Sequence, residues 1–561
     1  MSTRTLKPAD SLAPRMPYLW AGRGDVNAFF GLMLDNVGDM ILMAGLLIEV
    51  FGFPRDFVLT RMIPGTAVGV LVGDLIFTGM AFRLAKRSGR GDVTAMPLGL
   101  DTPSTFGSVF LILAPAFAAA KARGLDPTEA AGHAWFVGIA MILASGVFKL
   151  ACALFSGSIR RLVPRAGLLG SLSAIALVLI SFLPLLEIAR APVAGMAALG
   201  VILITLTARW RLPGNVPGAL AAVIVGGFVY YAMWAMRLGP GPGGGEMARP
   251  PLAFRPALPM PIAPWWDWLV VHWREAADFL PVAIPLALAT VVGGIDCTES
   301  AAAAGDDYPT GRIIAAEGVA TIVGGIFGGV IQSTPYIGHP AYKAMGARAG
   351  YTLATALFVG AAGVFGTFDW IFYLMPKAVV FPILIFVGLE ITAQSFRATP
   401  TRHYPAVVLA CVPALAYLAT LAVGQFLPEA KPFERMSPAA RHYLQTVTML
   451  SGGFIVSSLL WGTTLAHLID GRVRPAIAAL LLASGFSLFG VIHSPLPSGP
   501  IVPPGEAIQQ LKAIGRFETS SLQTPYHWAA AYAMAALGLV ALKFWGRRPD
   551  PTASLDLVRS D

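Results

Sequence analysis

Long runs of apolar residues, separated by short polar segments, make up most of this chain. Runs such as Met196–Leu206 and Ala476–Phe489, with their apolar flanks, approach the roughly 20 residues that an α-helix needs to cross a bilayer. The pattern therefore predicts an all-α polytopic membrane protein. The sixteen predicted membrane segments are 28–52, 60–82, 94–121, 133–155, 166–188, 192–208, 216–236, 279–304, 312–330, 331–348, 350–373, 377–396, 404–427, 443–470, 475–494 and 526–546.

The composition agrees with this pattern. Charged residues are only 13% of the 561 residues, and hydrophobic residues are 56%. Soluble proteins carry about 25% charged residues, so this chain has too few charges to cover a water-facing surface. Soluble enzymes, nucleic-acid binders and secreted disulfide scaffolds are thereby excluded. Cys152, Cys297 and Cys411 all lie in apolar stretches and form neither a metal-binding spacing nor a disulfide framework.

The net charge of +9 is best explained by basic residues in cytoplasmic loops. An even number of segments places both termini on one side, and segment 1–27 lacks the short apolar core and cleavage site of a signal peptide. We expect a multi-pass protein of the inner (plasma) membrane with both termini in the cytoplasm. The basic residues of the predicted inner loops include Arg83, Lys86, Arg87, Arg90, Arg160, Arg161, Arg165, Arg209, Arg211, Arg397, Arg402, Arg472 and Arg474.

The two halves of the chain resemble each other weakly, in the same order. The matching pairs are Val72–Phe77 with Val323–Phe327, Met96–Pro103 with Thr334–Pro340, and Leu162–Ala166 with Leu374–Ala378. They set segments 2, 3 and 5 against 9, 10 and 12. A shift of seven segments is odd, so the second half is inverted, which is typical of transporters that hold their substrate between the repeats. We predict a 7+7 transmembrane inverted repeat with about two extra C-terminal helices.

This repeat gives a predicted organisation in six parts. They are a cytoplasmic tail (1–27), a first repeat (28–236), an external Gly/Pro-rich loop with a Trp-rich interfacial helix (237–278), a second repeat (279–470), additional C-terminal helices (471–546) and a cytoplasmic tail (547–561).

Segments 3 and 10 are too irregular for continuous helices. Pro97, Gly99 and Pro103 interrupt the first, and Pro335, Gly338 and Pro340 interrupt the second. Short strands are expected before the breaks, at 93–96 and 330–334, and a half-helix after each. Non-helical backbone at membrane depth is tolerated where it lines a cavity, and a half-helix start attracts anions and carbonyl-rich ligands. The alternative is a pair of ordinary kinked helices.

Acidic side chains in the membrane segments are the first candidate site residues, because a charge at that depth is costly. Asp296 and Glu299 are three positions apart on one helix face, and Asp35 and Asp39 are four apart on segment 1. We expect Glu299 to bind substrate and Asp296, Asp39 and Asp35 to couple a cation. Helix capping or packing contacts are the alternative for each carboxylate.

The broken segments supply the remaining candidates for substrate binding. Asp101 follows the first break, where it either contacts the ligand or caps the half-helix. Gln332 and Ser333 can hydrogen-bond a heterocycle edge or an oxyanion. His339 can titrate near neutral pH, or serve only as a cap. We expect Asp101, Gln332, Ser333 and His339 to reach one ligand.

Some of these residues carry a family resemblance. Gly293–Ser300 with the following Gly-rich segment, and then Ser333-Thr334-Pro335, resemble the nucleobase–cation symporter-2 family of xanthine, uracil and ascorbate permeases. The resemblance implies a core of segments 1–4 and 8–11, a gate of segments 5–7 and 12–14, and strands in segments 3 and 10 that meet at the substrate. It also implies that Glu299 hydrogen-bonds the nucleobase, and it implies proton or sodium coupling and homodimers.

The sequence thus predicts a secondary active transporter, or permease, for a small polar solute such as a nucleobase. The alternative is an anion transporter of the sulfate-permease kind on the same fold. Enzymatic activity is not expected, because the sequence has no His-Glu-x-x-His and no nucleotide-binding Gly-x4-Gly-Lys motif. No metal or cofactor is expected beyond the coupling H⁺ or Na⁺, and the expected partners are the small solute and the lipid bilayer, with no nucleic acid.

Overall fold

The computed structural model of the protein describes residues 18–155, 165–239, 241–242, 256–336, 338–426, 436–496, 501–513 and 525–545. Most of both predicted tails, much of the Gly/Pro-rich loop and the Leu162–Pro164 part of the repeat lie outside the described residues. Within these ranges, nine helices are long and apolar enough to cross a membrane, or up to eleven if two bent helix pairs are counted as spans. The fold is therefore a multi-pass membrane fold.

A first bundle, called the core bundle here, combines helices from both halves of the chain. In it α14 packs against α6 and α3, α16 packs against α3 and α1, and α13 packs against α6. Stretches of π- or 3₁₀-helix carry the label η. The elements are α1 (Arg23–Gly45), η1 (Leu46–Val50), α2 (Arg55–Phe57), η2 (Val58–Met62), α3 (Ile63–Ser88), β1 (Leu98–Leu100), α4 (Thr102–Ser108), η3 (Val109–Leu113), α5 (Ala114–Ala122), α6 (Pro127–Leu154), α13 (Leu280–Ala303), α14 (Thr310–Ile326), β2 (Ser333–Pro335), α15 (His339–Ala344) and α16 (Gly350–Val364).

A second bundle, called the gate bundle here, is built in the same way from the remaining spans. In it α20 and α22 pack against α8, α19 packs against η4 and α8, and α10 packs against α11 and α19. The elements are α8 (Arg165–Ile175), η4 (Ala176–Phe182), α9 (Leu183–Arg190), α10 (Pro192–Ile202), η5 (Leu203–Thr207), η6 (Pro213–Asn215), α11 (Gly218–Ala235), α17 (Phe368–Leu374), α18 (Lys377–Val380), α19 (Pro382–Arg397), η8 (Thr401–His403), α20 (Tyr404–Phe426), α21 (Pro438–Ser451) and α22 (Phe454–Ile469).

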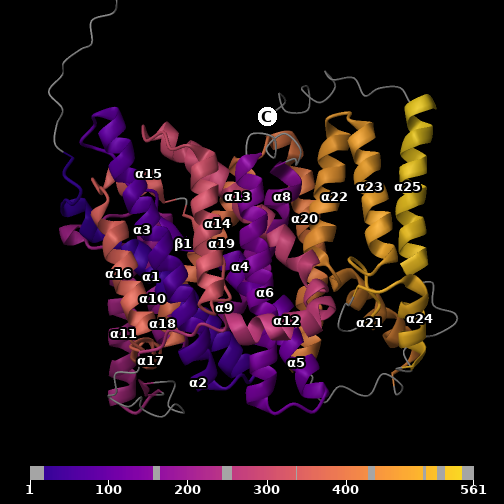
Figure 1. Ribbon diagram of the computed structural model, residues 1–561, viewed down its shortest axis with the longest axis horizontal. Helices are drawn as coiled ribbons and strands as arrows, with labels where there is room; N and C mark the ends of the chain where they lie inside the picture. Colours follow the sequence, from indigo (N-terminus) through magenta and orange to yellow (C-terminus); the bar gives the residue numbers. More distant parts are fainter. Residues whose placement is uncertain are drawn as a thin grey trace, which may run out of the picture.

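The C-terminal helices form an appendage at one end of the molecule. Figure 1 shows α22, α23 (Val473–Leu488) and α25 (Pro525–Trp545) standing side by side, with α24 (Pro504–Ala513) beneath them. They share a small apolar core that includes Leu460, Ala483 and Tyr532. The predicted addition of two helices to a 7+7 repeat is thus confirmed as α23 and α25.

Two predicted continuous spans are instead sharply bent. Segment 350–373 divides into α16 and α17 with a bend of 94°, and segment 443–470 divides into α21 and α22 with a bend of 74°. Gly366 and Gly453 lie at these breaks with φ of 71° and 65°. Glycine adopts this left-handed backbone at no steric cost, so the chain can turn there although both flanks are apolar.

The centre of the core bundle holds a two-stranded antiparallel sheet, in which Leu98 pairs with Pro335 and Leu100 with Ser333. The two predicted strands and their meeting are confirmed, but both lie later than expected, inside the Pro/Gly breaks. Each strand's outer edge is capped by side chains. The Leu98 and Leu100 amides donate to Asp74 and Asn36, at 3.2 and 3.0 Å. Lys149 donates to the Ser333 carbonyl at 2.9 Å. A sheet edge inside a membrane needs such partners, because lipid offers no hydrogen bonds.

We predict that Asn36→Leu lowers the free energy of unfolding by about 1–3 kcal/mol, because it leaves the Leu100 amide buried without an acceptor. Asn36→Asp keeps an acceptor oxygen and should lose less. Thermal unfolding of the detergent-solubilised protein measures the effect. The control is Thr66→Val, because the buried Thr66 hydroxyl donates only within its own helix, to the Met62 carbonyl. Equal losses for Asn36→Leu and Thr66→Val would contradict the role of Asn36.

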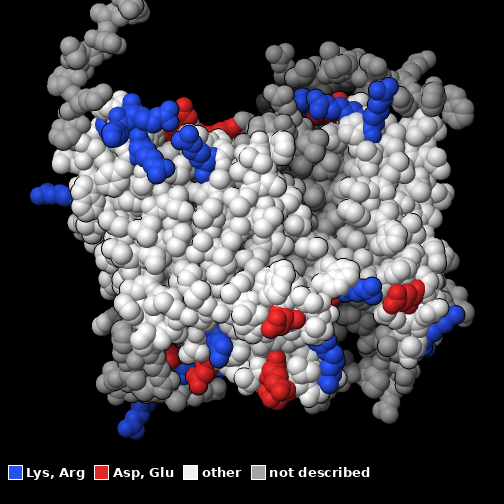
Figure 2. Space-filling view, viewed as in Figure 1, with Lys and Arg blue, Asp and Glu red and all other residues white. Residues whose placement is uncertain are grey.

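The charges of the described surface lie at two edges. Figure 2 shows Lys and Arg gathered along one edge, over the end of α3 and near α15, and a broad band without charge below them. Charges of both signs appear at the opposite edge. The uncharged band fits the hydrocarbon layer, and the positive-inside rule predicts that the basic edge faces the cytoplasm.

We therefore predict that the end of α3 is cytoplasmic and that helix α12 (Ile262–Ala277) is external. Single cysteines at the exposed positions Ser88 and Asp267, in a variant without native cysteines, test this. An impermeant maleimide added to intact cells should label the Asp267 position, and the Ser88 position only after permeabilisation. The reverse pattern would invert the topology.

Candidate functional site

A cavity of about 1250 Å³ lies between the two bundles. Its core wall includes the junctions that follow β1 and β2, together with α1 and α13. Its gate wall consists of α19, α8 and η5. The residues used below from its lining are Asp35, Asp101, Thr102, Arg209, Arg211, Thr290, Asp296, Ser300, Thr334, Tyr336, Phe386, Glu390 and Gln394. Since the bundles supply opposite walls, movement of one against the other would change the access to this cavity.

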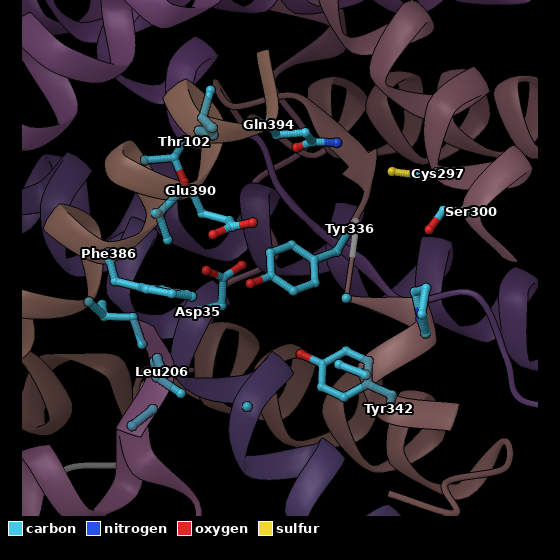
Figure 3. A pocket seen from close by; sticks show the side chains of 18 of the residues that line it. Asp35, Thr102, Leu206, Cys297, Ser300, Tyr336, Tyr342, Phe386, Glu390 and Gln394 are labelled. Carbon is cyan, nitrogen blue, oxygen red and sulfur yellow. The ribbon is translucent and has the colours of Figure 1, made fainter. Parts of the chain in front are cut away.

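Three polar side chains from different elements converge inside the cavity. Asp35 comes from α1, Glu390 from α19 and Tyr336 from the connection between β2 and α15, and Figure 3 shows their oxygens directed toward one another. Gly99 leaves room for Asp35, since a Cβ there would lie 3.3 Å from an Asp35 oxygen. The core and gate bundles thus face each other here through acidic groups.

Asp101 both caps a helix and lines the cavity, so the two interpretations of this residue are compatible. Its carboxylate accepts a hydrogen bond from the Ser104 amide at 2.8 Å, at the start of the helix Thr102–Ala122. Asp39 lies behind it, fully buried, and accepts from the Thr102 hydroxyl at 3.0 Å. Asp39 does not line the cavity but holds a residue that does.

The two acidic residues of α13 are placed differently. Asp296 lines the cavity, together with Ser300 one helical turn further on. Glu299 is half-buried on the same helix and is not part of the lining. The structure therefore brings Asp35, Asp101 and Asp296 to one cavity, and sets Asp39 and Glu299 outside its wall.

Gln332, Ser333 and His339 are buried behind the cavity wall. The Gln332 carbonyl accepts from the Asp101 amide at 3.0 Å, which extends the strand pairing by one bond. His339 lies on the side of α15 away from the cavity, with Nε2 3.3 Å from Asp306 and 3.2 Å from the Thr94 carbonyl. The expected approach of His339 and Asp101 to one ligand is not seen.

Asp306 is the centre of an ion cluster that fixes the chain entering β1. Its carboxylate lies 2.6 Å from Lys343 Nζ and 3.2 Å from Arg90, and it accepts from the Thr94 amide at 3.0 Å. Burial alone raises the pKa of Asp306, but the hydrogen bonds from His339 and Lys343 outweigh burial and hold the pKa below its usual value of 3.8. The charged form of Asp306 is therefore favoured in the fold.

We predict that Asp306→Asn destabilises the protein by about 1.5–3 kcal/mol at neutral pH, through loss of charge-assisted hydrogen bonds. Because the folded-state pKa lies below 3.8, the stabilisation is present above about pH 4 and is lost as the pH falls through the folded-state value. The difference in melting temperature between wild type and variant should shrink in acid. The exposed neighbour Asp307, changed to Asn, is the control. A pH-independent difference would contradict the mechanism.

One group outside the cavity has the residue types of a metal site. His133, His272 and Glu275 bring their ligand atoms within 4.8 Å of one another. The Trp268 indole donates to His133 Nδ1 at 3.0 Å, and His133 Nε2 lies 2.7 Å from the Glu275 carboxylate and 2.8 Å from the Arg123 guanidinium. Burial raises the pKa of Glu275, yet bonds from His133 and Arg123 lower it to about 2. This arrangement anchors α12 to α6.

The sequence analysis did not assign four residues that the structure places at or beside the cavity. Arg209 and Arg211 are exposed at its mouth, and Glu390 lines the gate wall. Lys149 is fully buried and pairs with Glu317 at 2.8 Å, directly behind β2. A lysine inside the apolar segment 133–155 was the available signal for this pair.

Solved structures of transporters resemble this chain. The transmembrane domain of the cyanobacterial bicarbonate transporter BicA matches with 14% identity and a TM-score of 0.47, over 72% of this chain and 97% of that chain. The overall structure of SLC26A9 matches with 12% identity and a TM-score of 0.48, over 80% and 65%. The murine Slc26a9 anion transporter in the inward-facing state matches with 14% and 0.46, over 74% and 68%. No protein-family model and no curated protein matches the sequence.

These matches correct the predicted family and function. The structures are of bicarbonate and anion transporters. The predicted membership of the nucleobase–cation symporter-2 family, and nucleobase uptake as the main function, are therefore wrong, and the anion-transporter alternative agrees better. At these identities and TM-scores the likeness carries no functional argument, so the function is inferred below from the cavity itself.

Proposed function

We propose that the protein is a secondary transporter that carries a small anion across the membrane by alternating access, coupled to a cation. The observation that carries this proposal is the charge pattern of the cavity. Two arginines, Arg209 and Arg211, stand at its mouth, and carboxylates lie inside it. The basic mouth raises the local concentration of anions. The helix Thr102–Ala122 also directs its positive dipole end into the cavity.

The inner carboxylates make coupling necessary. Asp35, Asp101, Asp296 and Glu390 line the same space, and their negative charges would repel an anion. Each bound proton or metal cation reduces that repulsion. Anion and cation then raise each other's affinity, since such coupling is reciprocal by linkage. The cavity therefore supports co-transport better than passage of an anion alone.

Each candidate residue has a role in this proposal. Asp35 and Asp296 hold the coupling cation, because they line the cavity on the core side. Asp101 and the hydroxyl groups of Thr334, Tyr336 and Ser300 contact the anion when the carboxylates are neutralised. Asp39 positions Thr102 through its hydrogen bond. Glu299, Gln332, Ser333 and His339 support the wall. Assembly as a homodimer in the cell membrane is part of the same proposal.

Transport by purified protein in liposomes tests the proposal. Chloride, bicarbonate, sulfate and formate are supplied with an inward proton gradient, an inward sodium gradient or neither. We expect at least one anion to accumulate only with a gradient, and a matching ionophore to abolish its accumulation. Accumulation of a neutral solute or an organic cation, with all four anions inert, would refute anion transport.

We predict that Asp35→Asn abolishes accumulation driven by the cation gradient while exchange of anion across the membrane persists. A coupling free energy of about 1–3 kcal/mol means that the bound cation raises the affinity for the anion roughly 5- to 150-fold, and Asp35→Asn should lose this increase. The matched control is Asp56→Asn, because Asp56 is exposed at the surface outside the cavity. Wild-type coupling in Asp35→Asn would remove Asp35 from the coupling site.

A further inference from the structure

The ammonium group of Lys149 lies in a shell of oxygen atoms contributed by two other elements. It is 2.8 Å from Glu317 Oε1, 2.9 Å from the Ser333 carbonyl oxygen and 3.4 Å from the Thr321 hydroxyl. The side chains of Lys149 and Glu317 are both fully buried. A carboxylate, a backbone carbonyl and a hydroxyl, all oxygen, are the ligands that hard monovalent cations take in proteins.

The carbonyl in this shell belongs to the broken span. Just before β2, the Gln332 carbonyl accepts from the amide of Asp101, the residue after β1. The next carbonyl, that of Ser333, instead faces Lys149 of α6 and Thr321 of α14. The strand pairing provides no donor for this buried carbonyl, so it needs a hydrogen-bond donor from elsewhere. Unwound backbone at the centre of a transporter commonly gives such carbonyls to a coupling Na⁺. Here Lys149, from α6, reaches that position.

We propose that Lys149 is a tethered cation, which fills with its own ammonium a site that would otherwise bind a free monovalent metal ion of the Na⁺ or Li⁺ class. The site links α6, α14 and β2, as a bound ion would. Because the ammonium is covalently attached, it does not leave during transport. The junction of the broken span then needs no Na⁺, and Na⁺ does not couple transport at this site.

This inference names the coupling ion of the proposed function. The carboxylates that line the cavity are then left to bind the coupling cation, and we take this cation to be a proton. The transport part of the inference rests on the proposed function, but the ion-binding part does not.

Vacating the site tests the ion-binding part directly. Lys149→Ala leaves Glu317, Ser333 and Thr321 facing an empty position. Apparent melting temperatures of the wild type and of Lys149→Ala are measured in NaCl, LiCl and choline chloride at equal ionic strength. We expect the melting temperature of Lys149→Ala to rise with Na⁺ or Li⁺ and to saturate, while choline has no effect. The wild type should not respond differently to the three salts.

The double variant Lys149→Ala with Glu317→Gln is the matched control, because it removes the charge that would hold the free ion. It should lose the response to Na⁺ and Li⁺. If Lys149→Ala unfolds in every salt while the double variant folds in all of them, the vacated oxygens do not hold a free ion and the proposal is overturned. An identical response of both variants to all salts also overturns it, since Lys149 is then only half of an ion pair.

A further test uses only the wild-type protein, so its result does not depend on whether a variant folds. Anion uptake into liposomes should proceed at an unchanged rate when choline replaces Na⁺ on both sides, and should follow the proton gradient. Uptake that requires Na⁺ overturns the part of the inference that names the proton as coupling ion, and it leaves anion transport intact. Absence of any anion uptake refutes the proposed function, while the melting-temperature series still decides the tethered cation.

Discussion

The pairing of three residues of β1 with three of β2 is the interaction on which the rest of this structure depends. An isolated two-stranded sheet has two outer edges of unpaired polar backbone groups, and in a membrane water cannot satisfy them. The chain meets this demand with side chains: Asp74 and Asn36 serve β1, and Lys149 serves β2. Charged residues are thus present in the core bundle because its backbone needs hydrogen-bond partners there.

The same pairing decides where the cavity lies and what charge it has. The helix that follows β1 can begin only beyond the sheet, which brings Asp101 and Thr102 to the surface between the bundles. The gate bundle adds Glu390 from the other side. Polar groups behind the sheet stabilise it, whereas those in front remain accessible to a solute. Position relative to the sheet, more than residue type, therefore separates the carboxylates that serve the fold from those that line the cavity.

The sequence was sufficient for the fold because Pro and Gly breaks repeat at equivalent positions in both halves, and such breaks have few structural solutions in a bilayer. It was less informative about the site. Whether His339 faces a ligand or Asp306 depends on how α15, a helix of six residues, is rotated about its axis. The spacing of apolar residues in so short a helix does not determine this rotation. Lys149 was visible as a charge in an apolar segment, but its partner Glu317 is 168 positions away. Long-range partners of this kind follow from packing alone.

The distance along the chain between the two strands has a consequence for biosynthesis. Leu100 and Ser333, which pair in the sheet, are separated by 233 positions. At about 5–20 residues per second, the ribosome needs roughly ten to fifty seconds to make the second strand after the first. Throughout that interval β1 has no partner, and the acidic residues near it have no finished cavity to line. The first half must therefore remain in the translocon, beside a chaperone or partly outside the bilayer until the second strand is made. We expect a membrane insertase that binds unpaired polar helices to determine the yield of this protein.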